Sequence, residues 1–334
     1  MKKIAAVIGF FLLFLFVTPV SAHEAYVLTR QEFLTGLAVN TPNPLGPLLD
    51  TSHLGITALI TVCVGLSFFF VIFWAATPWA SYLDKLIKKT KIIGPLIIRI
   101  AISASFFFAA ASNCVLGPEL SLSPVTGNVF ILTVLFAISL MIFFGVFIEV
   151  AALIGLIIFF YITNYYGVYM ITYANYFGEL IVLLLFGSRF LSVDRMLFGK
   201  KLWFAKLEKY KTLEVPIVRI LYGVALIYAG WTIKFQHQGL SIEVYNQYHL
   251  KDFFHASAAF IAAGAGLSEI SIGIFILLGF AMRFTVLISL FFITLSLLYF
   301  HELIWPHIML YGISFSLLIN SGDVFTIDHY VPFW

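Results

Sequence analysis

Long apolar runs, each close to the length that a helix needs to cross a lipid bilayer, follow one another along almost the whole chain. A membrane-spanning helix needs about 20 predominantly apolar residues. Hydrophobic residues make up 62% of the sequence and charged residues only 10%, whereas a soluble domain has about 25% charged residues. Backbone groups inside a bilayer must pair within their own segment, which favours helices. The sequence therefore predicts an all-α integral membrane protein that contacts the lipid bilayer.

The apolar runs predict about nine membrane-spanning helices. Their ranges are 54–79, 93–113, 128–146, 147–163, 172–188, 216–235, 254–279, 284–300 and 305–320. The first range is a leading helix. The others divide into two groups of four, a first unit (residues 93–195) and a second unit (residues 216–334), joined by a basic loop at 196–215.

The first 22 residues have the pattern of a secretory signal peptide. Lys2 and Lys3 precede an apolar run, and small residues lead up to a cleavage site after Ala22. Cleavage there would make His23 the mature N-terminus. It would also leave a polar extracytoplasmic segment, residues 23–53, ahead of the leading helix.

The distribution of basic residues predicts the orientation of the chain. Lysine and arginine concentrate in residues 80–92 and 189–215, and the positive-inside rule assigns both loops to the cytoplasm. We expect a multi-pass protein of the plasma (inner) membrane, with the mature N-terminus outside and the C-terminus in the cytoplasm. The second loop would lie along anionic lipid, and the pattern does not favour binding to nucleic acid.

Certain residues recur at two fixed spacings, which indicates an internal repeat. Arginine and glutamate pairs lie 120 residues apart, and glycine and aspartate pairs lie 134 apart: Arg99 with Arg219, Glu149 with Glu269, Gly178 with Gly312 and Asp194 with Asp328. Both arginines begin a span from the cytoplasmic side, so the two units would be parallel repeats, not inverted ones. The equal spacing favours equivalent places for the two glutamates in the repeat. In the competing interpretation, Glu149 starts its own helix.

The second unit resembles the DoxX family of four-helix membrane proteins. The resemblance rests on the run Arg219–Gly223 with Gly230, Lys234, Glu269, Gly273, Leu278–Gly279, Arg283, Gly322 and Ile327–Asp328. It implies a membrane subunit associated with quinone-linked redox processes such as thiosulfate oxidation, working with a redox partner subunit. The first unit keeps fewer of these residues. It has Cys114 at the place of Lys234 and no counterpart of Arg283, so it resembles a degenerate copy.

Charged residues inside or beside the spans form a predicted ion cluster in each unit. In the second unit we expect Glu269 to pair with Arg219 or Arg283, and Asp328 to complete the network. Charged groups in a membrane usually face the bundle and pair with one another. Arg99, Glu149 and Asp194 would form the corresponding cluster in the first unit. Such a cluster either clamps the helices together or provides a path for protons or anions.

Histidines concentrate at the predicted outer end of the second unit. The candidate catalytic residues are His301, Glu302, His307 and Glu269; the candidate cofactor-binding residues are Lys234, His237, His255 and Trp305; the candidate metal ligands are His301, His307 and His23. Neutral imidazole binds transition metals and carries protons near neutral pH. Aromatic and histidine side chains also populate membrane interfaces without a chemical role.

Two functions remain compatible with the sequence. The first is a subunit of quinone-linked electron transfer with a histidine-rich extracytoplasmic end, with quinone as the favoured cofactor over a metal. The second is a non-catalytic scaffold, or a transporter of protons or small solutes, that uses the Arg219–Glu269–Arg283 cluster. The chain has no Rossmann, P-loop or haem-attachment motif, so whether it is an enzyme stays open.

Overall fold

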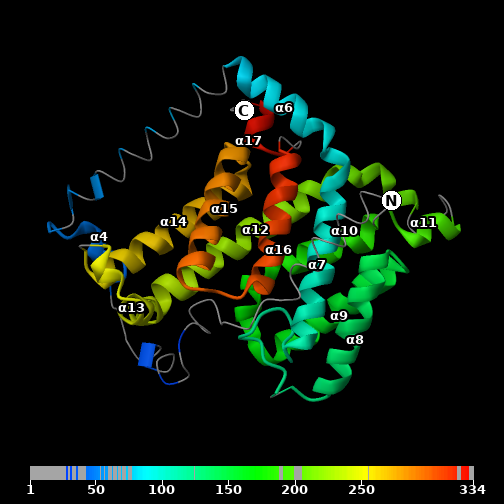
Figure 1. Cartoon of the computed structure of the whole chain (residues 1–334), viewed down its shortest axis with the longest axis horizontal. Helices are drawn as coiled ribbons and strands as arrows, with labels where there is room; N and C mark the ends of the chain where they lie inside the picture. The colour runs from blue at the N-terminus through cyan, green and yellow to red at the C-terminus, as the bar shows by residue number, and fades with distance from the viewer. Residues whose placement is uncertain are drawn as a thin grey trace.

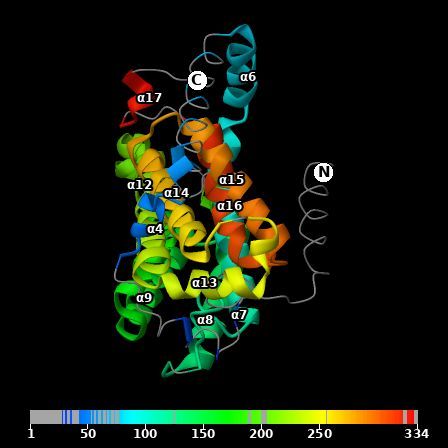
Figure 2. The same cartoon turned by 90° about the vertical axis from the view of Figure 1, so that its left-hand side faces the viewer.

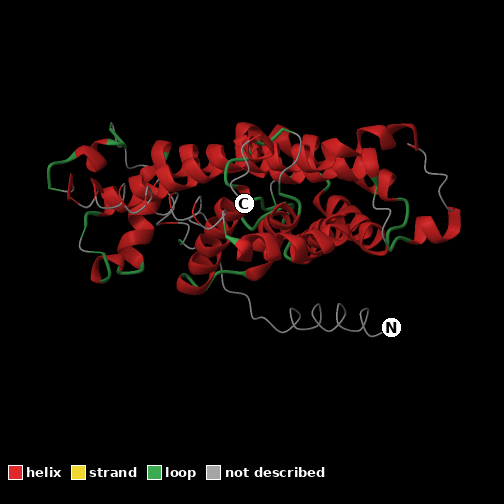
Figure 3. Cartoon of the chain, turned by 90° about the horizontal axis from the view of Figure 1, so that it is seen from above, coloured by secondary structure: helices red, strands yellow, loops and turns green. Residues whose placement is uncertain are grey.

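The computed structural model describes residues 77–123, 125–187, 191–198, 205–254, 256–321 and 325–330, together with 43–52 and scattered positions between 28 and 73. Within these residues every regular element is helical, and one isolated bridge joins Cys114 to Ser121 (Figure 3). The predicted all-α fold is therefore confirmed. The predicted signal peptide and most of the leading helix at 54–79 lie outside the described residues.

The helices of the first half are α4 (Gly46–Leu49), α6 (Pro78–Lys89), η2 (Lys91–Ile93), α7 (Gly94–Ala111), α8 (Asn128–Phe144), α9 (Ile148–Tyr166), η3 (Gly167–Tyr173), α10 (Ala174–Phe186) and α11 (Val193–Phe198). Those of the second half are η4 (Ala205–Leu213), α12 (Glu214–Ala229), the π-helix η5 (Gly230–Gln236), α13 (Gln238–Gln247), η6 (Leu250–Asp252), α14 (Ala258–Leu278), α15 (Met282–Tyr299), α16 (Ile304–Ile319) and α17 (Ile327–Tyr330).

Five helical stretches among the described residues are long and apolar enough to cross a membrane. They are 94–111, 148–186, 209–236, 258–278 and 282–299, and the shorter apolar helices α8 and α16 accompany them. The chain is a multi-pass membrane protein. Each helix from α7 to α16 that lies in a predicted span begins and ends within a few residues of the predicted limits.

The segment 80–92, predicted as a loop, is largely helical instead. Helix α6 exposes Trp79, Tyr82 and Leu86, and it also exposes Lys85 and Lys89. A helix with exposed aromatic, aliphatic and basic side chains suits the boundary between lipid and water. The prediction was wrong here because a short amphipathic helix has too few apolar residues to resemble a span.

The two ends of the bundle carry different elements. Helices α6 and α17, which sequence places on the cytoplasmic side, lie at one end, and α13, expected outside, lies at the other (Figures 1 and 2). Between them, α12 packs on α14 and α10, while α7 packs on α8 and α16. The last helix of each predicted unit therefore lies on the first helix of the other.

Small residues allow these exchanged contacts between the units. A Cβ atom on Gly312 of α16 would overlap the Cβ of Ala101 on α7, and one on Gly178 of α10 would lie 2.9 Å from Leu221 Cδ1 on α12. Glycine lets membrane helices approach closely. Gly178 and Gly312 are the glycine pair that the repeat predicts at equivalent positions.

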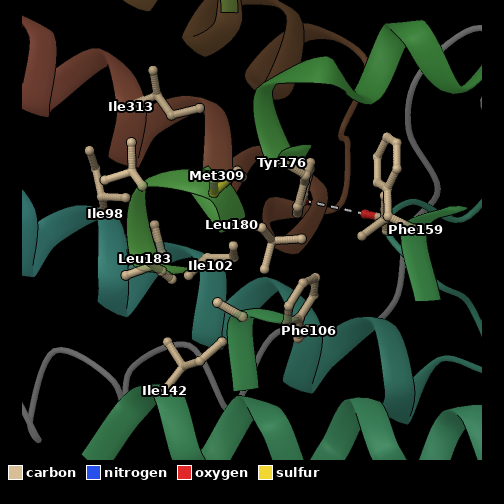
Figure 4. Packing of buried hydrophobic residues seen from close by; sticks show 14 of the residues in the cluster. Ile98, Ile102, Phe106, Ile142, Phe159, Tyr176, Leu180, Leu183, Met309 and Ile313 are labelled. Atoms are coloured by element: carbon tan, nitrogen blue, oxygen red, sulfur yellow. Dashed lines mark hydrogen bonds between the residues drawn. The ribbon is translucent and has the colours of Figure 1, made fainter. Parts of the chain in front are cut away.

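One large apolar core joins both units. Residues of α7, α8, α9, α10 and α16 meet in it, as Figure 4 shows for Ile98, Ile102, Phe106, Ile142, Phe159, Tyr176, Leu180, Leu183, Met309 and Ile313. The core includes Val218 and Tyr222 of α12, both almost fully buried. The two sets of helices thus share one interior, and the interface between them is as buried as the middle of either.

Candidate functional site

A cavity of about 620 Å³ lies among the helices of the second unit. Residues of α12 to α16 and of the π-helix η5 line it, and most of them are aliphatic or aromatic. Four ionisable side chains interrupt this apolar wall: Lys234, Glu269, Glu302 and His307. An apolar cavity of this size with a few convergent polar groups is the usual form of a small-molecule site.

Glu302 and His307 form a buried pair in the cavity wall. The Nε2 atom of His307 lies 2.8 Å from Oε2 of Glu302. The other ring nitrogen, Nδ1, lies 2.9 Å from the carbonyl oxygen of Leu303. Because a carbonyl can only accept, Nδ1 carries a proton there. The pair is then either an imidazolium beside a carboxylate or a neutral ring beside a carboxylic acid.

The turn before α16 brings these two side chains together. Glu302 donates its backbone N–H to the carbonyl of Leu297 at the end of α15, and the hydroxyl of Ser296 donates to Oε1 of Glu302 at 2.6 Å. His307 stands in the first turn of α16, where Pro306 costs no hydrogen bond because the first N–H groups of a helix have no partner within it. The turn therefore holds the carboxyl against the ring.

Lys234 and Glu269 enter the cavity where η5 crosses α14. A Cβ atom on Gly266 of α14 would lie 2.6 Å from the Cβ of Lys234, and one on Gly230 of η5 would lie 3.3 Å from the Cβ of Glu269. The two glycines thus let η5 and α14 approach closely, and Lys234 and Glu269 lie beside the crossing. The extra residue per turn of a π-helix often marks a functional position.

Exposed residues in the cavity wall mark its opening toward the surface. Ala265 and Ser268 of α14 and Phe292 and Leu295 of α15 line the cavity and are also exposed. The opening lies between these two membrane-spanning helices. An exposed apolar rim on a membrane helix faces lipid, so the opening suits a ligand that arrives from the bilayer.

A second cavity, of about 90 Å³, lies on the other side of Glu269 and His307. These two residues line both cavities. The first unit contributes most of the remaining polar side chains of the second cavity, among them Glu119, Tyr173 and Asn175. The hydroxyl of Tyr173 donates to Glu119. Ionisable groups of both units therefore approach one another at this interface.

The opposite end of the second unit holds Arg219 and Asp328. Arg219 is buried and donates to the carbonyl oxygens of Ile276, Leu277 and Phe325. Asp328 accepts 2.7 Å bonds from the backbone N–H groups of Ala281 and Met282, at the start of α15.

Opposing effects act on the pKa of Asp328. Burial raises its pKa, whereas the two backbone bonds and the nearby guanidinium groups of Arg283 and Arg219 act to lower it. Arginine and aspartate together tie the end of α14, the start of α15 and the segment after α16. This end of the unit is a structural clamp.

The first unit repeats this clamp. Arg99 donates to the carbonyl of Leu191 at 2.9 Å, as Arg219 does to that of Phe325. Asp194 accepts from the backbone N–H groups of Phe147 and Ile148 at 2.9 and 3.3 Å. These two donors stand at the positions that the glycine and aspartate spacing of the repeat makes equivalent to the donors of Asp328.

Comparison with known proteins relates part of the second unit to a family. The DoxX family model matches residues 215–302. We call this matched segment the DoxX domain. No curated protein and no solved structure matches the chain. The DoxX domain contains α12 to α15 and ends at Glu302, so it supplies most of the larger cavity, and the resemblance predicted for the second unit is confirmed.

Two predictions about the ion cluster need correction. Glu149 is the second residue of α9, whereas Glu269 lies in the middle of α14, so the two glutamates do not occupy equivalent places. Arg283 is the second residue of α15, and the spacing between Gly178 and Gly312 also separates Glu149 from Arg283. The position of Arg283 thus does have a counterpart in the first unit, and that counterpart is a glutamate.

Arg219 and Glu269 occupy different levels of the DoxX domain. Arg219 bonds to the carbonyl of Ile276, which lies about two turns beyond Glu269 along α14. Glu269 belongs to the cavity, and the clamp brings Arg219 and Arg283 close to Asp328. The predicted set Arg219–Glu269–Arg283 is thus divided between two sites.

Other predicted site residues do not line the cavity. His301 is exposed in the turn, His237 precedes α13, and Trp305 is buried beside Ala109 and Cys114. His255 and His23 lie outside the described residues. Within the described part of the chain no three His, Cys, Asp or Glu side chains gather closely enough to hold a metal ion.

Three polar residues of the interior were not predicted. Tyr222 is fully buried, with its hydroxyl 3.3 Å from those of Ser289 and Ser314. Glu119 belongs to the smaller cavity. Glu179 is fully buried in α10, and both of its carboxyl oxygens lack a hydrogen-bond partner among the described residues. A carboxylate inside the apolar range 172–188 was a signal as strong as that of Glu269.

Proposed function

We propose that the protein is a membrane subunit of quinone-linked electron transfer and that the cavity of its DoxX domain holds the quinone. One observation carries the proposal: an apolar cavity of about 620 Å³ contains a buried His307–Glu302 pair in its wall. This combination puts a proton-exchanging group inside a space suited to a lipid-soluble ring.

The residues present fit a quinone. Its ring and the start of its apolar tail need a largely apolar enclosure, which the aliphatic and aromatic walls supply. Its two oxygens need donors or acceptors of hydrogen bonds, and Lys234, Glu269, Glu302 and His307 supply both kinds. The opening between α14 and α15 gives a molecule dissolved in the bilayer a short route to these groups.

A bound quinone would supply two-electron, two-proton chemistry, with the electrons exchanged with a redox partner subunit. The chain's own part is to bind, orient and exchange protons. His307 holds a proton at Nδ1 through the carbonyl of Leu303, so its Nε2 atom and Oε2 of Glu302 share the exchangeable proton. Ser296 fixes the carboxyl by donating to Oε1. Lys234 adds a positive charge, which favours an anionic oxygen near it.

The proposed membrane and orientation follow from the sequence. Basic residues concentrate on the side of α6 and η4, which supports a cytoplasmic position for that end in the plasma (inner) membrane. The cavity would then open in the outer half of the bilayer, and protons exchanged at His307 would pass near the extracytoplasmic surface.

Quinone carried through purification tests the proposal. We expect protein purified in mild detergent to retain extractable quinone, and a Ser268→Trp variant, whose indole fills the cavity opening, to lose it. Leu267→Trp is the matched control, because Leu267 directly precedes Ser268 in α14, is 48% exposed and does not line the cavity. Wild-type protein that neither retains quinone nor binds an added short-chain quinone saturably would contradict the proposal.

A second candidate function is a scaffold or a transporter of small solutes. The clamp formed by Arg219 and Asp328 supports the scaffold, because its bonds hold helix ends together and recur in the first unit. In that case Ser268→Trp would leave function in cells intact, whereas a variant at Arg219 would abolish it.

A further inference from the structure

We propose that the interface between the two units conducts protons across the membrane, with Glu179 as the carrier in the middle of the bilayer. This goes beyond the quinone site, since it assigns a function to α10 and α12 and needs no bound quinone. The path would begin at Glu214 on the cytoplasmic side, pass through Glu179, and end in the smaller cavity at Glu269 and His307.

Glu179 is an unusual residue for the inside of a membrane protein. Its side chain is fully buried, and neither carboxyl oxygen has a hydrogen-bond partner among the described residues. A charged carboxylate without partners is very costly in such a place, so the group holds a proton instead. Buried carboxyl groups of this kind form proton relays in membrane pumps and transporters.

The face of α10 that carries Glu179 leads to the smaller cavity. Asn175 lies one turn earlier on this helix, so the two side chains are neighbours on one face. Asn175 lines the smaller cavity and is 2% exposed. The carboxyl therefore stands about one helical turn, roughly 5 Å, below a cavity that contains Glu269 and His307.

The facing helix continues the path to the cytoplasmic end. On α12, Tyr222 lines the smaller cavity, Val218 follows one turn toward the cytoplasm, and Glu214 follows one turn further. Gly178 packs on this part of α12, at Leu221 and Ile217. Glu214 is partly exposed and near enough for its charge to act on Glu179. Two carboxyl groups thus connect the cytoplasmic end with the cavity.

The two arginines on helices that pack against α10 have partners elsewhere, and Lys209 and Lys211 of η4, which also packs against α10, are exposed. Arg219 donates to carbonyls at the end of α14 and to Phe325, and Arg99 donates to Leu191. A Cβ atom on Gly187 would lie 2.7 Å from a carboxyl oxygen of Glu149, at the cytoplasmic end of α10. The guanidinium bonds point to the clamp, so among the described residues they leave Glu179 without a counter-ion and able to take and release a proton.

Each step of the path moves one proton between oxygen or nitrogen atoms. Glu179 first releases its proton through the smaller cavity to Glu269 or to the His307–Glu302 pair, and the carboxylate left behind then takes a proton from the carboxyl of Glu214. Each group that gives up a proton loses one unit of positive charge, and the next proton that it takes up restores its original protonated form. No other bond changes, and no oxidant or reductant takes part.

Proton flux into quinone-free liposomes tests the path. Reconstituted protein is given a potassium gradient and valinomycin, and an enclosed pH dye reports the rate of acidification. We expect wild-type protein to acidify the interior faster than protein-free liposomes do, and Glu179→Gln to lose the added rate. Glu243→Gln, which changes a carboxyl of α13 that lines neither cavity, should keep the wild-type rate.

A second variant guards against a folding defect in Glu179→Gln. Glu214→Gln changes a partly exposed group at the cytoplasmic entrance, and size-exclusion chromatography verifies that each variant stays folded. We expect its rate to fall as well. A wild-type rate no greater than that of protein-free liposomes, or a folded Glu179→Gln with undiminished flux, would overturn the proposal. Neither result bears on quinone retention, so failure of the path and failure of the quinone site are distinguishable.

Discussion

The two units resemble each other at the ends that hold the clamps and differ at the opposite ends. At the clamp ends, Arg99 and Arg219 bond to carbonyls at equivalent positions of the proposed repeat. Asp194 and Asp328 likewise accept from equivalent pairs of backbone N–H groups. A feature that persists in both units belongs to the architecture. The shared bonds support the proposed repeat.

At the ends opposite the clamps, the four ionisable residues Lys234, Glu269, Glu302 and His307 of the larger cavity all belong to the second unit. With the two spacings of the repeat, its four cavity residues correspond to apolar, thiol or phenol side chains of the first unit: Lys234 to Cys114, Glu269 to Leu135, Glu302 to Val168 and His307 to Tyr173. Leu135 is fully buried in the core. The first unit is packed where the DoxX domain is hollow, so the site belongs to the second unit alone.

Loss of either clamp arginine should be the most damaging change. We expect Arg99→Ala and Arg219→Ala each to lower the free energy of unfolding by about 3–5 kcal/mol, because each leaves buried groups without their charged partner. Thermal unfolding in detergent, followed by size-exclusion fluorescence, measures both. A large loss in one variant and none in the other would break the equivalence of the two clamps.

The helix crossings at equivalent positions of the two units should differ in how much a substitution destabilises them. Gly223 and Gly273 meet at the α12–α14 crossing, where a Cβ atom on Gly223 would lie 2.7 Å from the carbonyl oxygen of Gly273. Ser103 and Ser139 take these places in the first unit, and the hydroxyl of Ser103 donates to the carbonyl of Ser139 at 2.8 Å.

Gly223→Ala should therefore destabilise the protein by about 1–3 kcal/mol through overpacking. Ser103→Ala should cost about 1 kcal/mol, the value of one buried hydrogen bond. The same unfolding measurement compares them. If Gly223→Ala proved neutral, the crossing in the DoxX domain would be looser than the distances indicate.

The last and smallest effect that we predict is on the folded protein's thiol reactivity, which compares the surroundings of position 114 with those of position 234. Burial, assisted by the charge of Glu119, raises the pKa of Cys114 from 9.0 to about 11. With Cys63→Ser, which leaves Cys114 as the one thiol, alkylation at pH 8 should run about a hundredfold slower than for an ordinary thiol, since two pKa units separate their thiolate fractions. The rate should rise with pH until about 11.

A cysteine placed in the cavity serves as the comparison for that rate. Lys234→Cys, in a chain that lacks both native cysteines, should react faster than Cys114 with a membrane-permeant reagent because its side chain lines the open cavity. Mass spectrometry of the intact protein follows both reactions. Equal rates would show that the ends of the two units opposite the clamps are equally closed.

The sequence predicted the features that depend on periodic hydrophobicity. The spans from α7 to α16 have long apolar runs, and both their presence and their limits follow from the need to satisfy the backbone in lipid. Helix α6 was not predicted because its amphipathic run is short. The false equivalence of Glu149 and Glu269 arose because α13 and its neighbouring turns lengthen the second unit between Arg219 and Gly279, so the spacing changes before the glutamates are reached.

The candidate site was predicted in its residues but not in its geometry. Glu302, His307, Glu269 and Lys234 were candidates from their residue types, and all four line one cavity. Their pairing was not readable, since Glu302 and His307 meet through a turn and not along a helical face. The partners of Arg219 were also hidden, because they are backbone carbonyls, which every residue has.

Photolabelling with a photoreactive quinone analogue tests most directly whether the larger cavity of the second unit holds a quinone, as we propose. Purified protein is labelled in the presence and absence of excess natural quinone, and the labelled peptides are identified by mass spectrometry. We expect competable labelling of α14 and α15, near Ser268 and Phe292, and none in the corresponding helices α8 and α9 of the first unit. Labelling confined to the first unit, or labelling that excess quinone does not reduce, would contradict the proposed quinone site.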